Sequence, residues 1–376
     1  MDSLKTFAEI DLNALSHNLK VVKKKTRNRP SILAVVKASA YGHGAVEVSK
    51  HLLKGGVSRL GVAFTNEAIE LREAGIKAPI HVFFDRDNID ACFKYNLIPT
   101  VFDLETAERI SKEAYRRNLR IPVHIKVDTG MGRVGFRMEN ALQSILSVSR
   151  MKNLELEGLM SHFSDADLNQ RKFALLQLKN FRELMESLLK RKNINFRFFH
   201  ISNSAAILGF PEAHLNMVRP GIMLYGYGPT KDSLRPVLSL RSKVILVKSL
   251  PMGTPISYGG TFITKRRSII ATVPVGYADG YDRRLSNCGE VLINGKRAPV
   301  AGRVCMDTIM VDVTEIPDVR KDTEVVLIGS QGDERITADD IAQKIGSIPY
   351  EVLTSIGQRV KRIYLKNSAT CQKDNS

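Results

Sequence analysis

The sequence predicts an α/β protein with an N-terminal (β/α)8 TIM-like barrel plus a C-terminal mostly-β domain. Two features lead to this prediction. Over roughly the first 220 residues, apolar runs typical of buried strands alternate with amphipathic patterns typical of helices. From residue 235 onward the helical patterns nearly disappear, and short strand-like runs alternate with Gly, Pro and Asn-Gly turns. We therefore expect a barrel over residues 12–234, a β domain over 235–366 that takes in residues 1–11, and a loose tail over 367–376.

The barrel prediction depends on counting strands. Each candidate is a short apolar run, several of them rich in Val and Ile, and the runs read as buried strands because they lack polar alternation. A doubly wound open sheet is the alternative, because a strand count made from apolar runs separates the two folds only weakly. The eight candidate strands are Ile32–Val36, Arg59–Ala63, Ile80–Phe84, Ile98–Phe102, Val123–Val127, Leu156–Ser161, Phe196–Ile201 and Asn216–Arg219.

Helical patterns lie between these runs, and several begin with a residue that can cap a helix. Apolar residues recur at helical spacing over residues 13–26, 65–75, 103–118 and 169–193. Thr65 and Asp103 stand at the N-cap positions of the second and third patterns, and Thr337 at that of a helix in the β domain.

Composition and charge limit the class of protein. The four cysteines form no CxxC pair, which argues against a zinc site and a disulfide framework and favours a reducing compartment. No signal-peptide core and no apolar run of membrane-spanning length is present, so we expect a cytoplasmic protein without a membrane contact. The net charge of +17 is accompanied by no nucleic-acid-binding motif, and we interpret it as solvated basic surface.

Basic and polar side chains stand at the ends of the candidate strands, where barrels of this kind carry their active sites. Each has an ordinary explanation by itself: a lysine on the surface, a satisfied core histidine, a helix cap or an ion-pair partner. Their convergence on one end of one barrel favours a site. The residues concerned are Lys37, Asp128, Arg133, His162, Asn203, Ser204 and Arg219.

The last two barrel loops predict a phosphate site opposite a lysine. Loops after strands seven and eight often hold phosphate, and Ser204 at the start of a helix offers a hydroxyl there. Gly221 allows its backbone amide to approach an anion closely. A phosphate anchor together with Lys37 suggests pyridoxal 5'-phosphate bound covalently to the lysine. Covalent binding would explain why a lysine stands at the end of a buried apolar strand.

Nine segments in order carry a specific resemblance to a known family. They are AVVKASAYGHG, KVDTGMGRVGF, SHFSDAD, SNSAA, RPGIMLYG, ISYGGTF, VPVGYADGY, GRVCMDTIMVD and IPYEVLTSIGQRVKRIY. Together they resemble bacterial alanine racemase, a PLP-dependent fold type III family, over nearly the whole chain. One departure is Ser39, where the family usually has asparagine.

The resemblance implies a two-base interconversion of L- and D-alanine that supplies D-alanine for peptidoglycan. Lys37 would bind the cofactor and take the proton from the D-isomer, and Tyr258 would take it from the L-isomer. In this family that tyrosine reaches the active site of the partner subunit, so the resemblance implies a homodimer with shared sites.

The resemblance also implies the remaining site residues. Tyr41, Asn203, Ser204, Gly221, Ile222 and Tyr350 would bind the cofactor with its phosphate; Arg219 would face the pyridine nitrogen, and His162 would lie beneath the ring. Arg133 would contact the cofactor and, with Met306 of the partner subunit, the substrate. The substrate corridor would include Asp167, Tyr277, Arg283, Arg303 and Ile348, and some family members carbamylate the residue at Lys126.

Other functions remain open at this stage. A racemase of serine or of another small amino acid would keep the same residues, and a related decarboxylase would use a Gly-rich phosphate run and a catalytic cysteine. A non-catalytic PLP-binding protein would keep the barrel and the lysine but lack the β domain that carries Tyr258. A nucleic-acid binder is a remote further alternative.

Overall fold

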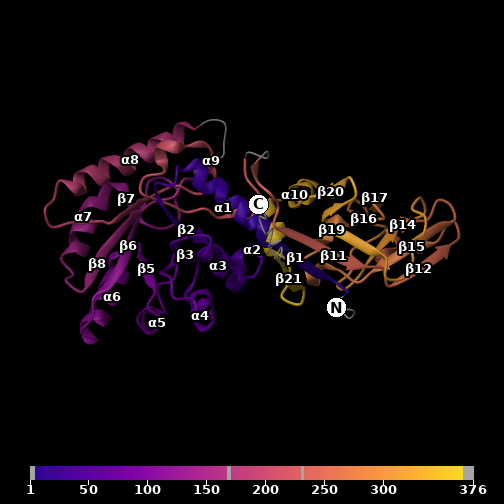
Figure 1. Cartoon of the computed structure of the whole chain (residues 1–376), viewed down its shortest axis with the longest axis horizontal. Helices are drawn as coiled ribbons and strands as arrows, with labels where there is room; N and C mark the ends of the chain where they lie inside the picture. The colour runs from indigo at the N-terminus through magenta and orange to yellow at the C-terminus, as the bar shows by residue number, and fades with distance from the viewer. Residues whose placement is uncertain (1–4, 167–170, 230–232, 367–376) are drawn as a thin grey trace, which may run out of the picture. The chain divides into compact units, whose positions relative to one another are not determined.

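The computed structural model describes residues 5–166, 171–229 and 233–366. The chain divides into two compact units. The first, here called the barrel unit, contains Leu15–Ala40 and Ala45–Arg235. The second, here called the β unit, contains the described residues before Leu15, the short segment Tyr41–Gly44 and the described residues from Pro236 onward. Figure 1 shows the barrel unit mainly in indigo and magenta and most of the β unit in orange and yellow.

The barrel unit contains the predicted parallel strands, so the predicted fold class is confirmed. Within the described residues the pairing order is β10-β2-β3-β4-β5-β6-β8-β9, and β7 pairs beside β6. These strands all pair in parallel within the described residues. The strands are β2 (Ser31–Val35), β3 (Arg59–Val62), β4 (Ile80–Val82), β5 (Ile98–Val101), β6 (Ile121–Asp128), β7 (Phe136–Arg137), β8 (Leu154–Met160), β9 (Phe198–His200) and β10 (Met217–Val218).

Asn216 links the two strands at which the barrel closes. Its side-chain oxygen accepts a hydrogen bond from the amide of Phe199 at 2.7 Å, and its side-chain nitrogen donates to the carbonyl of Arg197 at 2.8 Å. The amide of Arg219 donates to the carbonyl of Ser202 at 3.0 Å. These hydrogen bonds replace regular backbone pairing between β9 and β10. The residues that follow the two strands therefore lie at the same end of the barrel.

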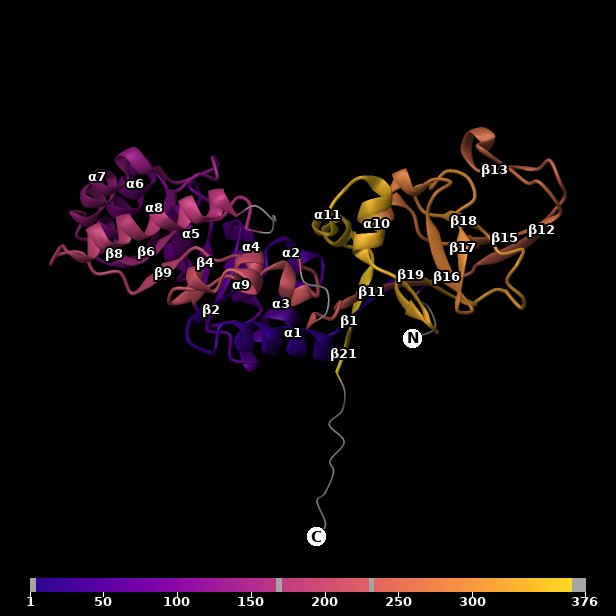
Figure 2. The same ribbon diagram turned by 90° about the horizontal axis from the view of Figure 1, so that it is seen from above.

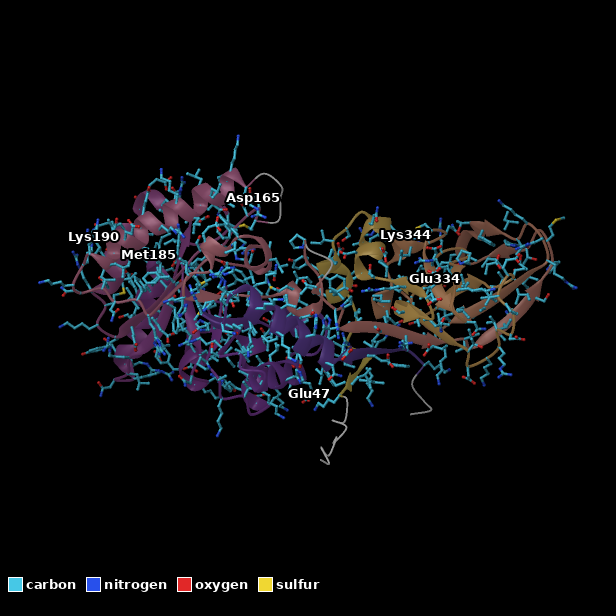
Figure 3. The ribbon with its side chains drawn as sticks, turned by 45° about the horizontal axis from the view of Figure 1, so that its top comes forward. Glu47, Asp165, Met185, Lys190, Glu334 and Lys344 are labelled. Carbon is cyan, nitrogen blue, oxygen red and sulfur yellow. The ribbon has the colours of Figure 1, made fainter. Side chains whose placement is uncertain are left out.

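Helices separate the strands along the chain, and Figure 2 shows them packed around the sheet. The barrel unit contains α1 (Leu12–Lys25) from Leu15 onward. Its other helices are α3 (Ala45–Lys54), α4 (Thr65–Glu73), α5 (Ile89–Lys94), α6 (Leu104–Arg116), α7 (Met138–Ser149), α8 (Lys172–Leu189) and α9 (Ser204–Gly209). Figure 3 shows Met185 and Lys190 near the C-terminal end of α8. In the described part of the chain, no helix combines the length and the apolar character needed to span a bilayer.

The predicted helix caps have different outcomes. Asp103 accepts a hydrogen bond from the amide of Thr106 at 2.7 Å and caps α6 as predicted. The prediction for Thr65 is wrong, because Thr65 is the first residue of α4 and its side chain caps nothing. Two other carboxylates satisfy this helix start: Glu67, within α4 itself, accepts from the amides of Ala63 and Phe64, and Asp85, from the loop after β4, accepts from the amide of Thr65 at 3.1 Å.

Two main sheets and a small hairpin form the β unit. The larger sheet has the order β17-β16-β19-β11-β1-β21 with β20 beside β19, the second is β12-β15-β18, and β13 pairs with β14. Figure 2 shows β12, β15 and β18 together at one end of this unit. The strands are β1 (Phe7–Asp11), β11 (Leu238–Lys243), β12 (Leu246–Leu250), β13 (Pro255–Ile256), β14 (Phe262–Ile263), β15 (Ser268–Val273), β16 (Glu290–Ile293), β17 (Lys296–Pro299), β18 (Ile309–Asp312), β19 (Glu324–Gln331), β20 (Glu334–Ile336) and β21 (Lys361–Leu365).

Strand β1 lies between β11 and the edge strand β21 of the larger sheet, antiparallel to β11 and parallel to β21. Two helices, α10 (Ala338–Ile345) and α11 (Pro349–Thr354), precede β21. Thr337 caps α10 by accepting from the amide of Asp340 at 3.1 Å, as its position in the sequence predicted.

Candidate active site

Lys37 lies two residues after the end of strand β2 and begins an unusual backbone turn. Ala38, Ser39, Ala40 and Tyr41 all have positive φ, between 51° and 55°, so the short segment α2 (Lys37–Tyr41) is a left-handed turn. A left-handed conformation costs a residue other than glycine about 1–2 kcal/mol, and it persists only where the surroundings impose it. The turn therefore marks a position at which backbone geometry is maintained against local preference.

Glu67 holds the start of this turn. One of its carboxylate oxygens accepts a hydrogen bond from the amide of Ala38, and the other accepts from the amides of Ala63 at 2.7 Å and Phe64 at 3.1 Å. The carboxylate thus joins the residue after Lys37 to the loop after β3. Sequence reasoning missed Glu67, because its pattern there is that of an ordinary capping glutamate.

The ammonium group of Lys37 lies beside Phe84 and near Arg133. Its nitrogen is 5.8 Å from the centre of the Phe84 ring, and the Arg133 guanidinium is 5.1 Å from the same centre. Burial and the positive charge of Arg133 lower the pKa of Lys37, while Glu67 acts in the opposite direction. The amine is therefore easier to deprotonate than a lysine in water.

Arg219 is buried at the end of β10, with its terminal nitrogens anchored by protein acceptors. One terminal nitrogen donates to Nδ1 of His200 at 2.7 Å and to the carbonyl of His200 at 2.9 Å. The other donates to the carbonyl of Ser161 at 2.6 Å, to Nδ1 of His162 at 3.2 Å and to the carbonyl of Ile201 at 3.2 Å. Among the described residues, the Nε–H has no hydrogen-bond acceptor. This donor is therefore the one left for a ligand.

The basic groups at this end of the barrel unit lower one another's pKa values. Burial, followed by the charge of Arg133, lowers the pKa of Arg219 to about 9. Burial, Arg219, Lys126, Arg133 and Lys37 keep the pKa of His162 well below its usual range. Such a concentration of positive charge favours anionic ligands, since a bound anion relieves the mutual repulsion.

Lys126 on β6 is the most isolated of these cations. Its side chain is 4% exposed, and its Nζ has no hydrogen-bond partner among the described residues. Burial, Arg219 and Arg133 keep its pKa well below that of a free lysine, and Asp128 compensates only in part. Burial without a partner disfavours the charged form of this amine and favours its neutral, nucleophilic form.

The phosphate-binding residues predicted in the barrel lie close together. The hydroxyl oxygen of Ser204 accepts hydrogen bonds from the amides of Gly221 at 2.9 Å and Met223 at 3.3 Å. Asn203 caps α9 by accepting from the amide of Ala206 at 3.1 Å, which leaves the Ser204 side chain directed at Gly221. Ile222 follows as a buried residue. The structure thus brings together Asn203, Ser204, Gly221 and Ile222.

Arg133 extends from a loop that glycines allow to turn tightly. Asp128 at the end of β6 accepts hydrogen bonds from the amides of Gly130, Met131 and Gly132 at 2.9, 2.7 and 3.1 Å. Gly135 has a φ of 127°, and a Cβ there would lie 2.7 Å from the amide nitrogen of Asp128. Only glycine fits that position, so the loop that presents Arg133 has a fixed path.

In the β unit, Tyr258 is presented on a strained turn between β13 and β14. Its side chain is 72% exposed. Ser257 before it has a φ of 63° and is held by a 2.7 Å hydrogen bond from its hydroxyl to the carbonyl of Arg303. Gly259 and Gly260 after it also have positive φ, at 71° and 54°. The phenol therefore projects from the unit on a backbone of defined shape.

The segment around Met306 is fixed by an ion-pair cluster. Its carbonyl accepts from the amide of Ala278 at 3.1 Å. Arg359 makes two bonds to Asp279, at 2.6 and 3.0 Å, and one to Asp307 at 2.8 Å. Sequence reasoning missed Arg359 and Asp279, because a surface-type arginine and a loop aspartate carry no local signal.

The remaining predicted residues lie mostly on the surface of the β unit. Tyr277, Ile348 and Tyr350 are 42%, 57% and 42% exposed, and Arg283 and Arg303 are exposed. The ring of Tyr350 lies 6.0 Å from that of Tyr41, whose pKa is raised by burial and by Tyr350. Asp167 lies outside the described residues.

The fold and the site define a class before any comparison is made. A parallel barrel offers a lysine with a lowered pKa, unsatisfied donors and a concentration of cations at the carboxyl ends of its strands. These are the features of a barrel enzyme that binds an anionic substrate or cofactor at a reactive amine.

Comparison with known proteins identifies the family. Residues 10–229 match the alanine racemase N-terminal domain, and residues 237–364 match the alanine racemase C-terminal domain. The chain is 51% identical over 362 residues to the alanine racemase of Thermodesulfovibrio yellowstonii, covering 95% of this chain and 97% of that protein.

Two solved structures show the same fold. An alanine racemase of Clostridium difficile superposes with a TM-score of 0.92 at 39% identity, covering 98% of this chain and 97% of that one. The alanine racemase of Bartonella henselae, crystallised with covalently bound pyridoxal phosphate, gives a TM-score of 0.87 at 29% identity and covers 96% of this chain and 100% of that one. The chain belongs to the alanine racemase family, and it is an amino-acid racemase, an isomerase.

Proposed function

We propose that this protein interconverts L-alanine and D-alanine with pyridoxal 5'-phosphate, using Lys37 and Tyr258 as bases on opposite faces of the substrate. The observation that carries the proposal is the environment of Lys37. Lys37 stands at the start of a strained turn, and its amine has a lowered pKa and lies near Arg133. Alanine as substrate is supported by relatives that are alanine racemases, including that of Thermodesulfovibrio yellowstonii at 51% identity.

The residues of the barrel unit fit the cofactor. The hydroxyl of Ser204 and the amide of Gly221 lie 2.9 Å apart and would hold the phosphate together with Asn203 and the Ile222 amide, while Lys37 would bind the aldehyde carbon. Tyr41 and Tyr350, whose rings lie 6.0 Å apart, would add their hydroxyls at the phosphate. When bound, the cofactor delocalises the electron pair left on the substrate Cα after proton removal.

Arg219 would donate its free Nε–H to the ring nitrogen of the cofactor. Because a guanidinium donates and does not accept, it disfavours protonation of that nitrogen. This limits transamination, since less charge is drawn into the ring. His162, bound to Arg219 at 3.2 Å, would support the arginine from beneath the ring.

Proton transfer then requires one base on each face of the substrate. Burial and Arg133 lower the pKa of Lys37, which favours the neutral amine, and Lys37 would accept the Cα proton of the D-isomer. Tyr258 would accept the proton of the L-isomer and return it in the reverse direction. Arg133 and the amide of Met306 would hold the substrate carboxylate, which keeps Cα between the two bases.

We propose a homodimer in which each site is completed by the partner subunit. The side chains of Tyr258, Met306 and Ile348 in the β unit are 72%, 52% and 57% exposed, so each offers apolar surface that a partner subunit could cover. A second copy placing this face against its barrel mouth would bury them. The substrate corridor of this assembly would include Asp167, Tyr277, Arg283, Arg303 and Ile348.

Lys126 is proposed to react with carbon dioxide. Its amine is buried, without a partner and depressed in pKa, and it lies in the field of Arg219 and Arg133. A carbamate at this position would convert an amine whose charged form is unfavourable into an anion that can accept hydrogen bonds from Arg133. The enzyme would act in the cytoplasm and supply D-alanine for peptidoglycan.

Two variants test the proposed catalysis. Lys37→Ala should lose the visible absorption of the bound cofactor, whereas Tyr258→Phe should retain it and lose racemisation starting from L-alanine. Mixing the two inactive variants should restore part of the activity, because half of the sites in a mixed dimer would have both bases. Failure to restore activity after demonstrated subunit exchange would contradict the shared site.

A chiral assay over free amino acids tests the substrate. Alanine should be racemised with the highest kcat/KM. A higher value for serine or another small amino acid would replace alanine as the substrate, and no turnover with any amino acid despite bound cofactor would indicate a non-catalytic binding protein.

A further inference from the structure

A hydrogen-bonded chain runs through the interior of the barrel unit away from Arg219. Arg219 donates to Nδ1 of His200 at 2.7 Å. The Nε2 of His200 lies 2.7 Å from Nδ1 of His124, and the Nε2 of His124 lies 3.1 Å from a carboxylate oxygen of Glu157. His200, His124 and Glu157 come from β9, β6 and β8, and both histidines are fully buried.

The proton positions along this chain follow from Arg219. Because a guanidinium only donates, Nδ1 of His200 must accept, and the proton of the neutral ring must be on Nε2. That N–H donates to Nδ1 of His124, so the proton of His124 must also be on Nε2 and is donated to Glu157. Burial and the surrounding cations keep the pKa of His200 well below its usual range, in agreement with a neutral ring. All three hydrogen bonds therefore point from Arg219 toward Glu157.

Glu157 is the anionic end of the chain and is itself anchored. Arg59 on β3 donates to both of its carboxylate oxygens, at 2.9 and 2.6 Å. The side chains of Arg59 and Glu157 are only 8% and 11% exposed. Arg59 also donates to Nε2 of His81 at 3.2 Å, which keeps the adjacent histidine neutral and turned toward the arginine.

The same residues do not form a metal site. His81, His124 and Glu157 have ligand atoms within 4.8 Å of one another, as a cation site would require. The guanidinium of Arg59, however, already donates to Glu157 and His81 and supplies the positive charge. A metal ion would have to displace a buried arginine from a two-point ion pair.

We propose that Glu157 is a positioning residue for Arg219, acting through His124 and His200. A histidine that donates to a carboxylate becomes a better acceptor at its other nitrogen, and successive hydrogen bonds polarise one another. Glu157 thereby strengthens the bond from Arg219 to His200 and fixes the direction of the free Nε–H. Arg59 keeps the carboxylate ionised and in place. This inference rests on the proposed role of Arg219 at the cofactor ring.

The test compares Glu157→Gln, the double variant Arg59→Gln/Glu157→Gln, and the control Glu155→Gln in the holoenzyme. Glu155 lies on the same strand but is exposed, so its replacement removes the same charge without touching the chain. The double variant removes both members of the buried pair and leaves no stranded arginine, so it folds even if the single variant does not.

The direct readout is nitrogen NMR of protein labelled at histidine and arginine. In the wild type, His124 and His200 should both carry their proton on Nε2. In Glu157→Gln and in the double variant, the Nε2–H signal of His200 and the Nε–H signal of Arg219 should shift, while Glu155→Gln leaves both in place. The kcat should fall about tenfold with KM within about twofold.

Two results would overturn the inference. One is a set of His200 and Arg219 signals that stays unchanged in both Glu157 variants, and the other is a shift of these signals without any fall in kcat. The proposed function fails separately: Arg219→Lys that leaves both cofactor absorption and kcat unchanged would remove Arg219 from the ring, whatever Glu157 does.

Discussion

Replacing Ala38 by glycine should stabilise the protein, although it removes a methyl group and loosens the chain. Ala38 has a φ of 51° and an exposed side chain, so no packing is lost. The left-handed conformation costs alanine about 1–2 kcal/mol. Glycine avoids this cost but loses about 0.5–1 kcal/mol more backbone entropy on folding. The net stabilisation should be about 0.5–1 kcal/mol.

Thermal unfolding followed by circular dichroism measures this change. For a unit of this size the melting temperature should rise by about 1–4 °C. The matched control is Ala74→Gly, because Ala74 ends α4 with an ordinary φ of −75°. Glycine there should lower the melting temperature, so the two substitutions should have opposite signs.

The same substitution should reduce activity. Glycine at residue 38 gives the turn after Lys37 additional conformations, so kcat should fall by about threefold while stability rises. A lower melting temperature for Ala38→Gly, of the same size as for Ala74→Gly, would show that the turn stores no strain. The reasoning from backbone conformation would then be refuted.

Three further predictions follow from the contacts described above. Gly135→Ala should destabilise the protein by more than about 2 kcal/mol and weaken binding of substrate, because its Cβ would lie 2.7 Å from backbone. The control Gly132→Ala, with open space at its Cβ, should cost only about 1 kcal/mol. Equal effects of the two substitutions on unfolding free energy would contradict the steric argument. Burial tends to raise the pKa of Glu157, but the hydrogen bonds from His124 and Arg59 outweigh this effect and lower the pKa from 4.5 to about 2. Because the folded pKa is lower, this carboxylate stabilises the fold above about pH 4.5, and on the order of 3 kcal/mol should be lost as the pH falls toward 2. The double variant without the ion pair should lose less stability than the wild type over this pH range, by about that amount. Labelled bicarbonate should give a carbamate carbon signal in NMR that is absent from Lys126→Met, and no signal in the wild type would exclude the modification under those conditions.

The strands were predictable because their signal is local. Short apolar runs such as Ile98–Phe102 became β5 (Ile98–Val101) with an error of one residue, since a strand buried on both faces needs only a continuous apolar run. A helix cap was predictable only where the capping residue and the amide that it accepts from are close together in the sequence. Asp103 caps α6 through an amide three residues away, whereas the start of α4 depends on Asp85, twenty positions further along the chain.

The candidate site was predictable in part for the same reason. Lys37, His162 and Arg219 each follow an apolar run, and the ends of parallel strands meet at one end of a barrel whatever the details of packing. The left-handed turn after Lys37 gave no such signal, because its residues at 38–40 are Ala, Ser and Ala, which do not favour positive φ. Tertiary contacts, including the one from Glu67, impose it.

The sequence by itself determined the alternation of strands and helices, the change to a β-rich second part and the set of basic residues at the strand ends. The sequence did not determine which polar side chains are hydrogen-bonded or ion-paired with one another. Arg219, His200, His124 and Glu157 come from separate segments, and only the closure and stagger of the barrel bring their atoms within 2.7 to 3.1 Å. A hydrogen bond depends on distances of a few tenths of an ångström between such segments, and only the packed tertiary structure sets those distances.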